Sequence, residues 1–209
     1  MEKNKKSNLI DKTGREYRAF CTFELKKEQR NDNGEEQDYV HGVPVVFNTP
    51  TVLWEYDGIE FKEQIDRHAF DKCDMSDVIF NYNHGGHVAA RLRNNTLKLS
   101  INDVGMEMDA FLGGTEFGRQ LLEEIRGGYI DKMSFAFTVA EDGDEYDAAT
   151  HTRTITRIKK LYDVSAVDIP AYDTTSISAR DLFSVEYEKE KKALEQAELR
   201  RKCIAKTKI

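Results

Sequence analysis

Between residues 16 and 169, apolar and polar side chains alternate over one short run after another. Alternation at every second position is typical of strands that have one face in a core and the other in water. Residues 16–25 and 39–47 predict two such strands, and residues 97–110 predict a hairpin around a turn at 102–105. This pattern limits the chain to a mostly β fold, and we expect the α+β class.

The other segments of this region have less regular patterns. Residues 26–38 are nearly all polar and predict an exposed hairpin loop, whereas residues 61–70 predict a short irregular or helical piece. Further strands are expected at 78–82, 130–139 and 152–169, with an acidic turn at 141–147.

Two segments have the spacing of helices. Thr115 is a good N-cap residue, an apolar stripe follows it, and two glycines end the segment at 127–128, which predicts a helix over 115–126. Residues 183–208 predict a charged helix with a thin apolar stripe. We therefore expect a polar N-terminal segment (1–16), one domain (17–181) and a charged helical tail (182–209).

Composition restricts the class of protein. The net charge is -7, whereas a nucleic-acid-binding domain usually presents a basic face. The three cysteines form no CxxC pair, and the first residues lack the apolar core of a signal peptide, which favours a reducing compartment. No run approaches the roughly 18 apolar residues of a membrane span. We expect neither nucleic acid nor membrane as a partner.

Ser134 is the first candidate for chemistry. On a strand, it shares a face with the small side chains of Ala136 and Thr138, while larger apolar residues occupy the other face. Another chain could approach such a face closely. A serine hydroxyl becomes a good nucleophile only when a base removes its proton, and a serine on a strand is more often structural.

His84 is the candidate base. It follows the short strand at 78–82 and precedes Gly85 and Gly86, which would leave the imidazole open to a substrate. Histidine titrates near neutral pH and can act as base and then as acid. One alternative is a histidine on a surface turn, and another is a metal site with His87, although a lone HxxH without nearby acidic or cysteine ligands is a weak metal motif.

Asp163 lies within an apolar strand, where an acid is costly unless it is paired. On a regular strand it would share a face with Leu161 and Ser165. Its carboxylate could orient a histidine and stabilise the histidine cation. Alternatively, it is an edge-strand acid that meets solvent or Arg157. The chain order histidine, serine, aspartate and the lack of a GxSxG elbow differ from those of the chymotrypsin, subtilisin and α/β-hydrolase classes.

Five segments resemble those of a known family, the caudoviral prohead proteases, and occur in the same order. They are a glycine-bearing strand ending in Val-Phe-Asn (42–48), Glu-x-Ile-x-x-x-Ala-Phe (63–70), an Asn-His pair (83–84), Met-Ser-Phe-x-Phe (133–137) and acid-Val-Ser-x-Val-x-x-Pro-Ala (163–171). The resemblance covers residues 17–180. The chain departs from the family at two positions. The family usually carries Glu where this chain has Asp163, and it often carries an acidic residue after the Asn-His pair, where this chain has Gly85.

The resemblance implies a serine endopeptidase with His84 as base, Ser134 as nucleophile and Asp163 as third member, needing no metal or cofactor. It implies a fold similar to herpesvirus assemblin, a β-barrel core with surrounding helices. The expected substrates are capsid-assembly proteins, namely scaffold or capsid-protein delta segments and the protease itself. They would be cleaved inside the assembling prohead in the host cytoplasm. A homodimer or higher oligomer is a further expectation, since assemblin-like enzymes often work as dimers.

Two other functions agree with the residues. One is a non-catalytic capsid scaffold or assembly module that retains the protease fold, for which Ser134 would be dispensable. The other is a metal-dependent hydrolase that uses His84, His87 and a carboxylate, but this gives no reason for the position of Ser134 on a face of small side chains.

Overall fold

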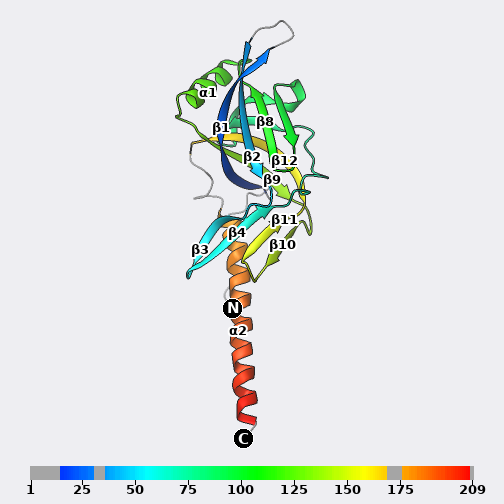
Figure 1. The fold of residues 1–209 in the computed structure, drawn as a ribbon, viewed down its shortest axis with the longest axis vertical. Coiled ribbons are helices and arrows are strands. Elements are labelled where there is room, and N and C mark those ends of the chain that lie inside the picture. Colours follow the sequence, from blue (N-terminus) through cyan, green and yellow to red (C-terminus); the bar gives the residue numbers. More distant parts are fainter. Residues whose placement is uncertain (1–14, 31–35, 169–175, 208–209) are drawn as a thin grey trace, which may run out of the picture.

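A computed structural model of the chain describes residues 15–30, 36–168 and 176–207. It has two β-sheets and two α-helices, the second of which projects away from the sheets (Figure 1). The elements are β1 (Glu16–Arg30), β2 (Glu36–Val46), β3 (Thr51–Tyr56), β4 (Ile59–Ile65), β5 (Ile79–Tyr82), β6 (Gly85–Arg91), a 3-10 helix (Leu92–Asn94), β7 (Leu97–Ile101), β8 (Gly105–Phe111), α1 (Glu116–Arg126), β9 (Lys132–Val139), β10 (Asp144–Asp147), β11 (Thr152–Ile155), β12 (Ile158–Val167) and α2 (Ser176–Thr207).

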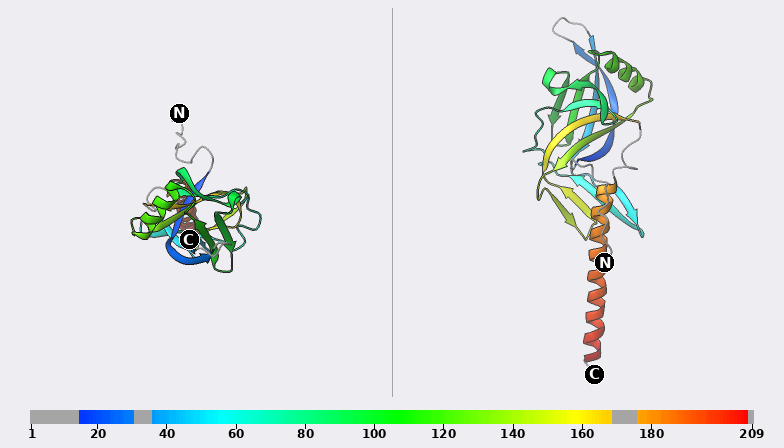
Figure 2. Two further views of the ribbon diagram at one scale, coloured as in Figure 1. Left: turned by 90° about the horizontal axis from the view of Figure 1, so that it is seen from above. Right: turned by 180° about the vertical axis from the view of Figure 1, so that it is seen from behind.

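The larger sheet has eight strands in the order β6-β5-β12-β9-β1-β2-β8-β7. It curves around the main hydrophobic core (Figure 2). Its end strands β6 and β7 approach each other. Within the described ranges no hydrogen-bonded ladder joins those two strands, so the sheet does not close into a barrel. The fold is mostly β of the α+β class, and two helices rather than a surrounding set accompany the sheets.

The smaller sheet has the order β10-β11-β4-β3, with β11 parallel to β4. A second apolar cluster lies between this sheet and the start of α2, where the rings of Phe61 and Phe183 are 5.3 Å apart between centroids and both residues are fully buried. Burial of one such side chain stabilises a fold by about 2 kcal/mol. These two rings therefore attach α2 to the β4 side of the molecule.

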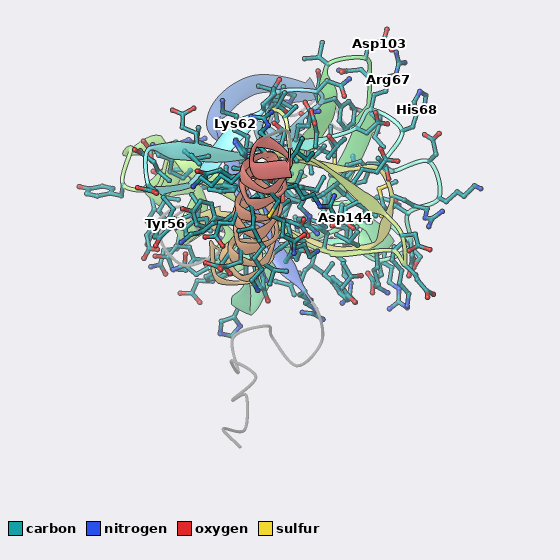
Figure 3. All side chains as sticks on the ribbon, turned by 90° about the horizontal axis from the view of Figure 1, so that it is seen from below. Tyr56, Lys62, Arg67, His68, Asp103 and Asp144 are labelled. Atoms are coloured by element: carbon teal, nitrogen blue, oxygen red, sulfur yellow. The ribbon has the colours of Figure 1, made fainter. Side chains whose placement is uncertain are left out.

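Beyond this attachment, α2 has few neighbours. Leu194, Leu199 and Ile204 are all more than half exposed. Figure 3 views the molecule from the free end of α2, with Tyr56, Lys62 and Asp144 labelled on the small sheet. The predicted charged helix is confirmed, although it begins at Ser176, before the expected tail. Of the helices in the described ranges, none has the length and hydropathy to cross a membrane.

The predicted helix at 115–126 is confirmed with its cap. Thr115 Oγ1 accepts a hydrogen bond of 2.9 Å from the backbone N–H of Gly118, which satisfies one of the free donors at the helix start. Leu121, Leu122 and Ile125 are buried, as the stripe predicted. The hairpin predicted over 97–110 is also confirmed, as β7 and β8.

Several polar segments were predicted wrongly. The loop expected at 26–38 is mostly strand in the residues that the structure describes, because β1 continues to Arg30 and β2 starts at Glu36, and the two strands pair antiparallel up to these ends. Part of the irregular piece expected at 61–70 is β4, in which the alternating Phe61, Glu63 and Ile65 are all buried. The strands β3, β6 and β10 were not expected. Backbone pairing does not need an apolar side chain, so the apolar pattern underestimates strands of this kind.

A cluster of five charged residues joins the two sheets, and three of them, Arg18, Glu63 and Arg153, are buried. Glu63 of β4 is fully buried and accepts from Arg18 of β1, with 2.8 Å between Arg18 Nη2 and Glu63 Oε2. Arg153 of β11 donates through Nη1 to Glu63 Oε2 at 2.9 Å and to Glu16 Oε2 at 2.8 Å, and through Nε to Asp144 Oδ2 at 2.6 Å. Because each buried charge has an opposite partner, the cluster ties β1 of the large sheet to three strands of the small one.

The cluster also determines how Glu16 ionises. Burial opposes ionisation of this carboxyl, but the charges of Arg18 and Arg153 and their hydrogen bonds outweigh it and hold its pKa at about 2. Burial lowers the pKa of Arg18, but the negative charges of Glu63 and Glu16 outweigh this effect and raise it. Both groups therefore stay charged at neutral pH.

Removal of the central carboxylate should destabilise the protein. Glu63→Gln removes the fully buried carboxylate that Arg18 and Arg153 share in addition to Glu16. We expect a loss of about 3 kcal/mol in the free energy of unfolding, measured by urea denaturation. Asp103→Asn is the control, since its 2.8 Å pair with Arg67 is exposed (Figure 3) and should contribute less than about 1 kcal/mol. Equal losses in the two variants would contradict a special role for the buried cluster.

The cluster also predicts a pH dependence of stability. Since the pKa of Glu16 is about 2 in the folded state and 4.5 is its ordinary value, its contribution is complete above about 4.5 and is lost as the pH falls toward 2. That contribution is on the order of 3 kcal/mol. Urea unfolding at a series of acidic pH values should show a shallower decline in Glu16→Gln than in the wild type. Parallel declines would show that other carboxyls account for the acid sensitivity.

Candidate active site

His84 lies in the tight turn between β5 and β6. Tyr82 pairs with Gly85, so only Asn83 and His84 form the turn, and their φ angles are 49° and 56°. Two residues with positive φ are typical of a type I′ hairpin turn, in which asparagine suits the first position and glycine the second. A histidine in the second position has an uncommon backbone conformation, and such residues often occur at functional sites.

The same turn is hydrogen-bonded to the end of β12. The backbone N–H of Asn83 donates to Ala166 O at 2.9 Å, and the N–H of Asp168 donates to Asn83 Oδ1 at 3.3 Å. Because β5 also runs parallel to β12 along residues 163–166, the turn carries the imidazole of His84 over the middle of β12.

Ser134 lies on β9, between β12 and β1. Its side chain shares a face with Ala136, as predicted, and both residues are fully buried. The opposite face carries Met133, Phe135 and Phe137, which belong to the main core. The core residues therefore fix the strand that presents Ser134.

Asp163 reaches the face of Ser134 because β12 is irregular. Leu161 pairs with Phe137 and Asp163 with Ala136, so the register shifts by one residue between them. Residues that pair across two strands share a face, which places Leu161 on the core face and Asp163 on the face of Ser134. The prediction that Leu161 and Asp163 share a face was wrong, because a β-bulge interrupts the alternation.

The three predicted residues meet in one hydrogen-bonded array. His84 Nδ1 is 2.6 Å from Asp163 Oδ1, and His84 Nε2 is 2.7 Å from Ser134 Oγ. Asp163 is almost completely buried, whereas 15% of the His84 side chain is exposed. With Nδ1–H donated to the carboxylate, Nε2 is left to accept the serine proton, which is the geometry that a general base needs.

Other side chains around His84 were not anticipated. Ser165 Oγ lies 2.7 Å from Asp163 Oδ1 and 3.1 Å from His84 Nδ1, and it also contacts the amide of Asn81. The ring of Tyr17 packs against the imidazole with 4.6 Å between centroids. The alternation of Asp163 with Ser165 could have indicated Ser165, but nothing in the sequence pairs Asn81 or Tyr17 with His84.

His87 does not join this array. Its ring packs 5.5 Å from that of Phe117 of α1. Across the part of the chain that the structure describes, no group of three or more His, Cys, Asp or Glu side chains is arranged to hold a metal ion. The donor set that the metal-hydrolase hypothesis requires is therefore missing from those residues.

Comparison with known proteins identifies the family. A solved structure with a similar fold is the bacteriophage T4 capsid assembly protease, gp21, at 11% sequence identity and a TM-score of 0.48, covering 73% of this chain and 96% of that one. The search of curated proteins finds no match. The family model of the caudovirus prohead serine proteases matches residues 23–191, which is most of the chain. The chain therefore belongs to the caudovirus prohead serine protease family.

Proposed function

We propose that Ser134 is the nucleophile, His84 the general base and Asp163 the third member of the catalytic triad of this protease. The array of 2.6 Å and 2.7 Å hydrogen bonds that links the three side chains carries the proposal. Because the chain belongs to this family, it is a serine protease that processes capsid-assembly proteins during phage maturation. The proposal adds which residues of this chain perform the chemistry.

The reaction follows from the positions of the protons. His84 Nε2 takes the proton of Ser134 as Oγ attacks the carbonyl carbon of a peptide bond, and the tetrahedral intermediate collapses to an ester while the imidazolium returns the proton to the leaving amine. Water then attacks the ester with His84 again as base, which releases the acid and restores Ser134. Backbone N–H donors that stabilise the oxyanion would complete the site.

Asp163 acts through His84. Its carboxylate holds the hydrogen on Nδ1, so Nε2 is the free acceptor, and its negative charge stabilises the imidazolium that forms in each step. The shorter side chain than the family's usual glutamate still reaches the imidazole at 2.6 Å. The bulge before Asp163 supports this reach, because it turns the carboxylate toward His84.

We further infer that scaffold or capsid-protein delta segments, together with the protease itself, are the substrates, and that cleavage takes place inside the assembling prohead in the host cytoplasm. The boundary of the protease domain at residue 181 remains a prediction, and α2 runs across it. The exposed end of α2 suits a tether to scaffold or a segment removed by self-cleavage.

Co-expression with the capsid and scaffold proteins of the same source tests the function. The wild type should cleave them, and Ser134→Ala and His84→Ala should abolish the cleavage detected by intact mass, because each removes a partner in the proton transfer. His87→Ala is the matched control and should retain activity, since His87 lies outside the array. Cleavage by Ser134→Ala would exclude Ser134 as nucleophile. Normal shell assembly without any cleavage by the wild type would favour the scaffold-module alternative.

Asp163→Asn should slow the reaction by about a thousandfold or more while the protein remains folded. The amide can donate a hydrogen to Nδ1, which favours the tautomer that carries hydrogen on Nε2 and cannot accept from Ser134. The measurement is the rate at which a fluorophosphonate probe labels Ser134, followed by mass. A labelling rate close to that of the wild type would remove Asp163 from the mechanism.

A further inference from the structure

We propose that Ser165 is a positioning residue, which donates its hydroxyl hydrogen to Asp163 and thereby holds the carboxylate against His84, and that Asn81 orients Ser165. This inference rests on the proposed triad. It assigns a purpose to two buried polar residues that the proton transfers themselves do not use.

The residues form a row across three neighbouring strands. On β12, Ser165 pairs with Ser134 of β9 on one side and with Asn81 of β5 on the other. Paired residues share a face, so the three polar side chains point to the same side of the sheet. Asp163 lies on this face two residues before Ser165. Ser165 therefore occupies the centre of the array.

The contacts of Ser165 are polar and buried. Ser165 is fully buried and Asn81 almost so. The hydroxyl oxygen of Ser165 lies 2.7 Å from Asp163 Oδ1, 3.1 Å from His84 Nδ1 and within hydrogen-bond distance of the Asn81 side-chain amide. A buried hydroxyl that touches three polar groups is well placed to orient all of them.

The direction of the hydrogen bonds follows from the number of hydrogens. A serine hydroxyl donates one hydrogen and accepts two. Asp163 is the stronger acceptor because a carboxylate is charged and an amide oxygen is not. In the structure, Ser165 Oγ faces Asn81 Oδ1. One hydroxyl hydrogen cannot be donated to both Asn81 and Asp163, and the O and N atoms of an amide are assigned only from the hydrogen-bond network. We therefore assign the NH2 group of Asn81 to the side that faces Ser165 Oγ. The chain of donors then runs from Asn81 through Ser165 to Asp163.

The arrangement gives Asp163 a second donor. A buried carboxylate is stable only when it is hydrogen-bonded, and His84 Nδ1 and Ser165 Oγ both lie within 2.7 Å of Asp163 Oδ1. While His84 Nε2 takes up and gives back the proton, the hydrogen bond from Ser165 keeps the carboxylate of Asp163 in place. Without Ser165, the carboxylate can rotate about its side chain and draw the imidazole away from Ser134.

The direct test is the labelling of Ser134 by a fluorophosphonate probe in the full chain. Ser165→Ala should slow labelling about ten- to a hundredfold, the range expected for a hydrogen bond to a charged group, and should lower kcat for protein cleavage with little change in KM. Thr138→Val is the matched control. It removes a hydroxyl from the same face of β9 that has no hydrogen-bond partner among the described residues, and it should label at the wild-type rate.

A double-mutant cycle separates positioning from a general structural effect. If Ser165 acts through Asp163, adding Ser165→Ala to Asp163→Asn should slow labelling by less than about threefold beyond Asp163→Asn alone. Equal losses in both backgrounds, or wild-type labelling of Ser165→Ala, would overturn the proposal. Ser165→Cys, similar in size but a weak donor, repeats the cycle should the alanine variant not fold. A wild type that is not labelled at Ser134 would instead refute the proposed triad.

Discussion

The register between β9 and β12 is the constraint on which the site depends. These strands lie inside the large sheet, and the one-residue shift between Leu161 and Asp163 determines which side chains face the core. Before the shift, Leu161 of β12 points into the core. After the shift, Val164 and Ala166 point into the core, whereas Asp163 and Ser165 lie on the face of Ser134. Without the bulge, a strand that buried Leu161 would turn Asp163 away from its predicted partners.

The strand β1 links the site to the buried charges. Glu16 and Arg18 point toward Glu63 and Arg153 in the cluster between the sheets. Tyr17, between them in the chain, points the other way and packs its ring against His84. Because side chains alternate along a strand, one face of β1 contacts the charged cluster between the sheets and the other face contacts the imidazole of His84.

The sequence predicted more of the site than of the fold around it. His84, Ser134 and Asp163 could be named because the segments that carry them resemble those of a known family, whereas their residue types alone left structural alternatives open. The structure does bring the three side chains together. Helix α1 and the β7–β8 hairpin could be predicted because their caps, turns and apolar spacing are local signals. By contrast, β4 could not, since a buried Glu63 breaks the apolar pattern, and its partners Arg18 and Arg153 are 45 and 90 residues away in the chain. The bulge in β12 has no local signal of its own, so the alternation placed Leu161 on the wrong face.

The three members of the array differ in how firmly the sheet holds them. Ser134 and Asp163 lie on interior strands with a neighbour on each side, whereas His84 lies on the hairpin that forms one end of the sheet, with β6 as its outermost strand. End strands open by local fluctuations more readily than interior ones. Partial opening of this hairpin would withdraw the imidazole while the serine and the carboxylate stayed in place. Warming would then inactivate the enzyme reversibly, below the temperature at which the molecule as a whole unfolds.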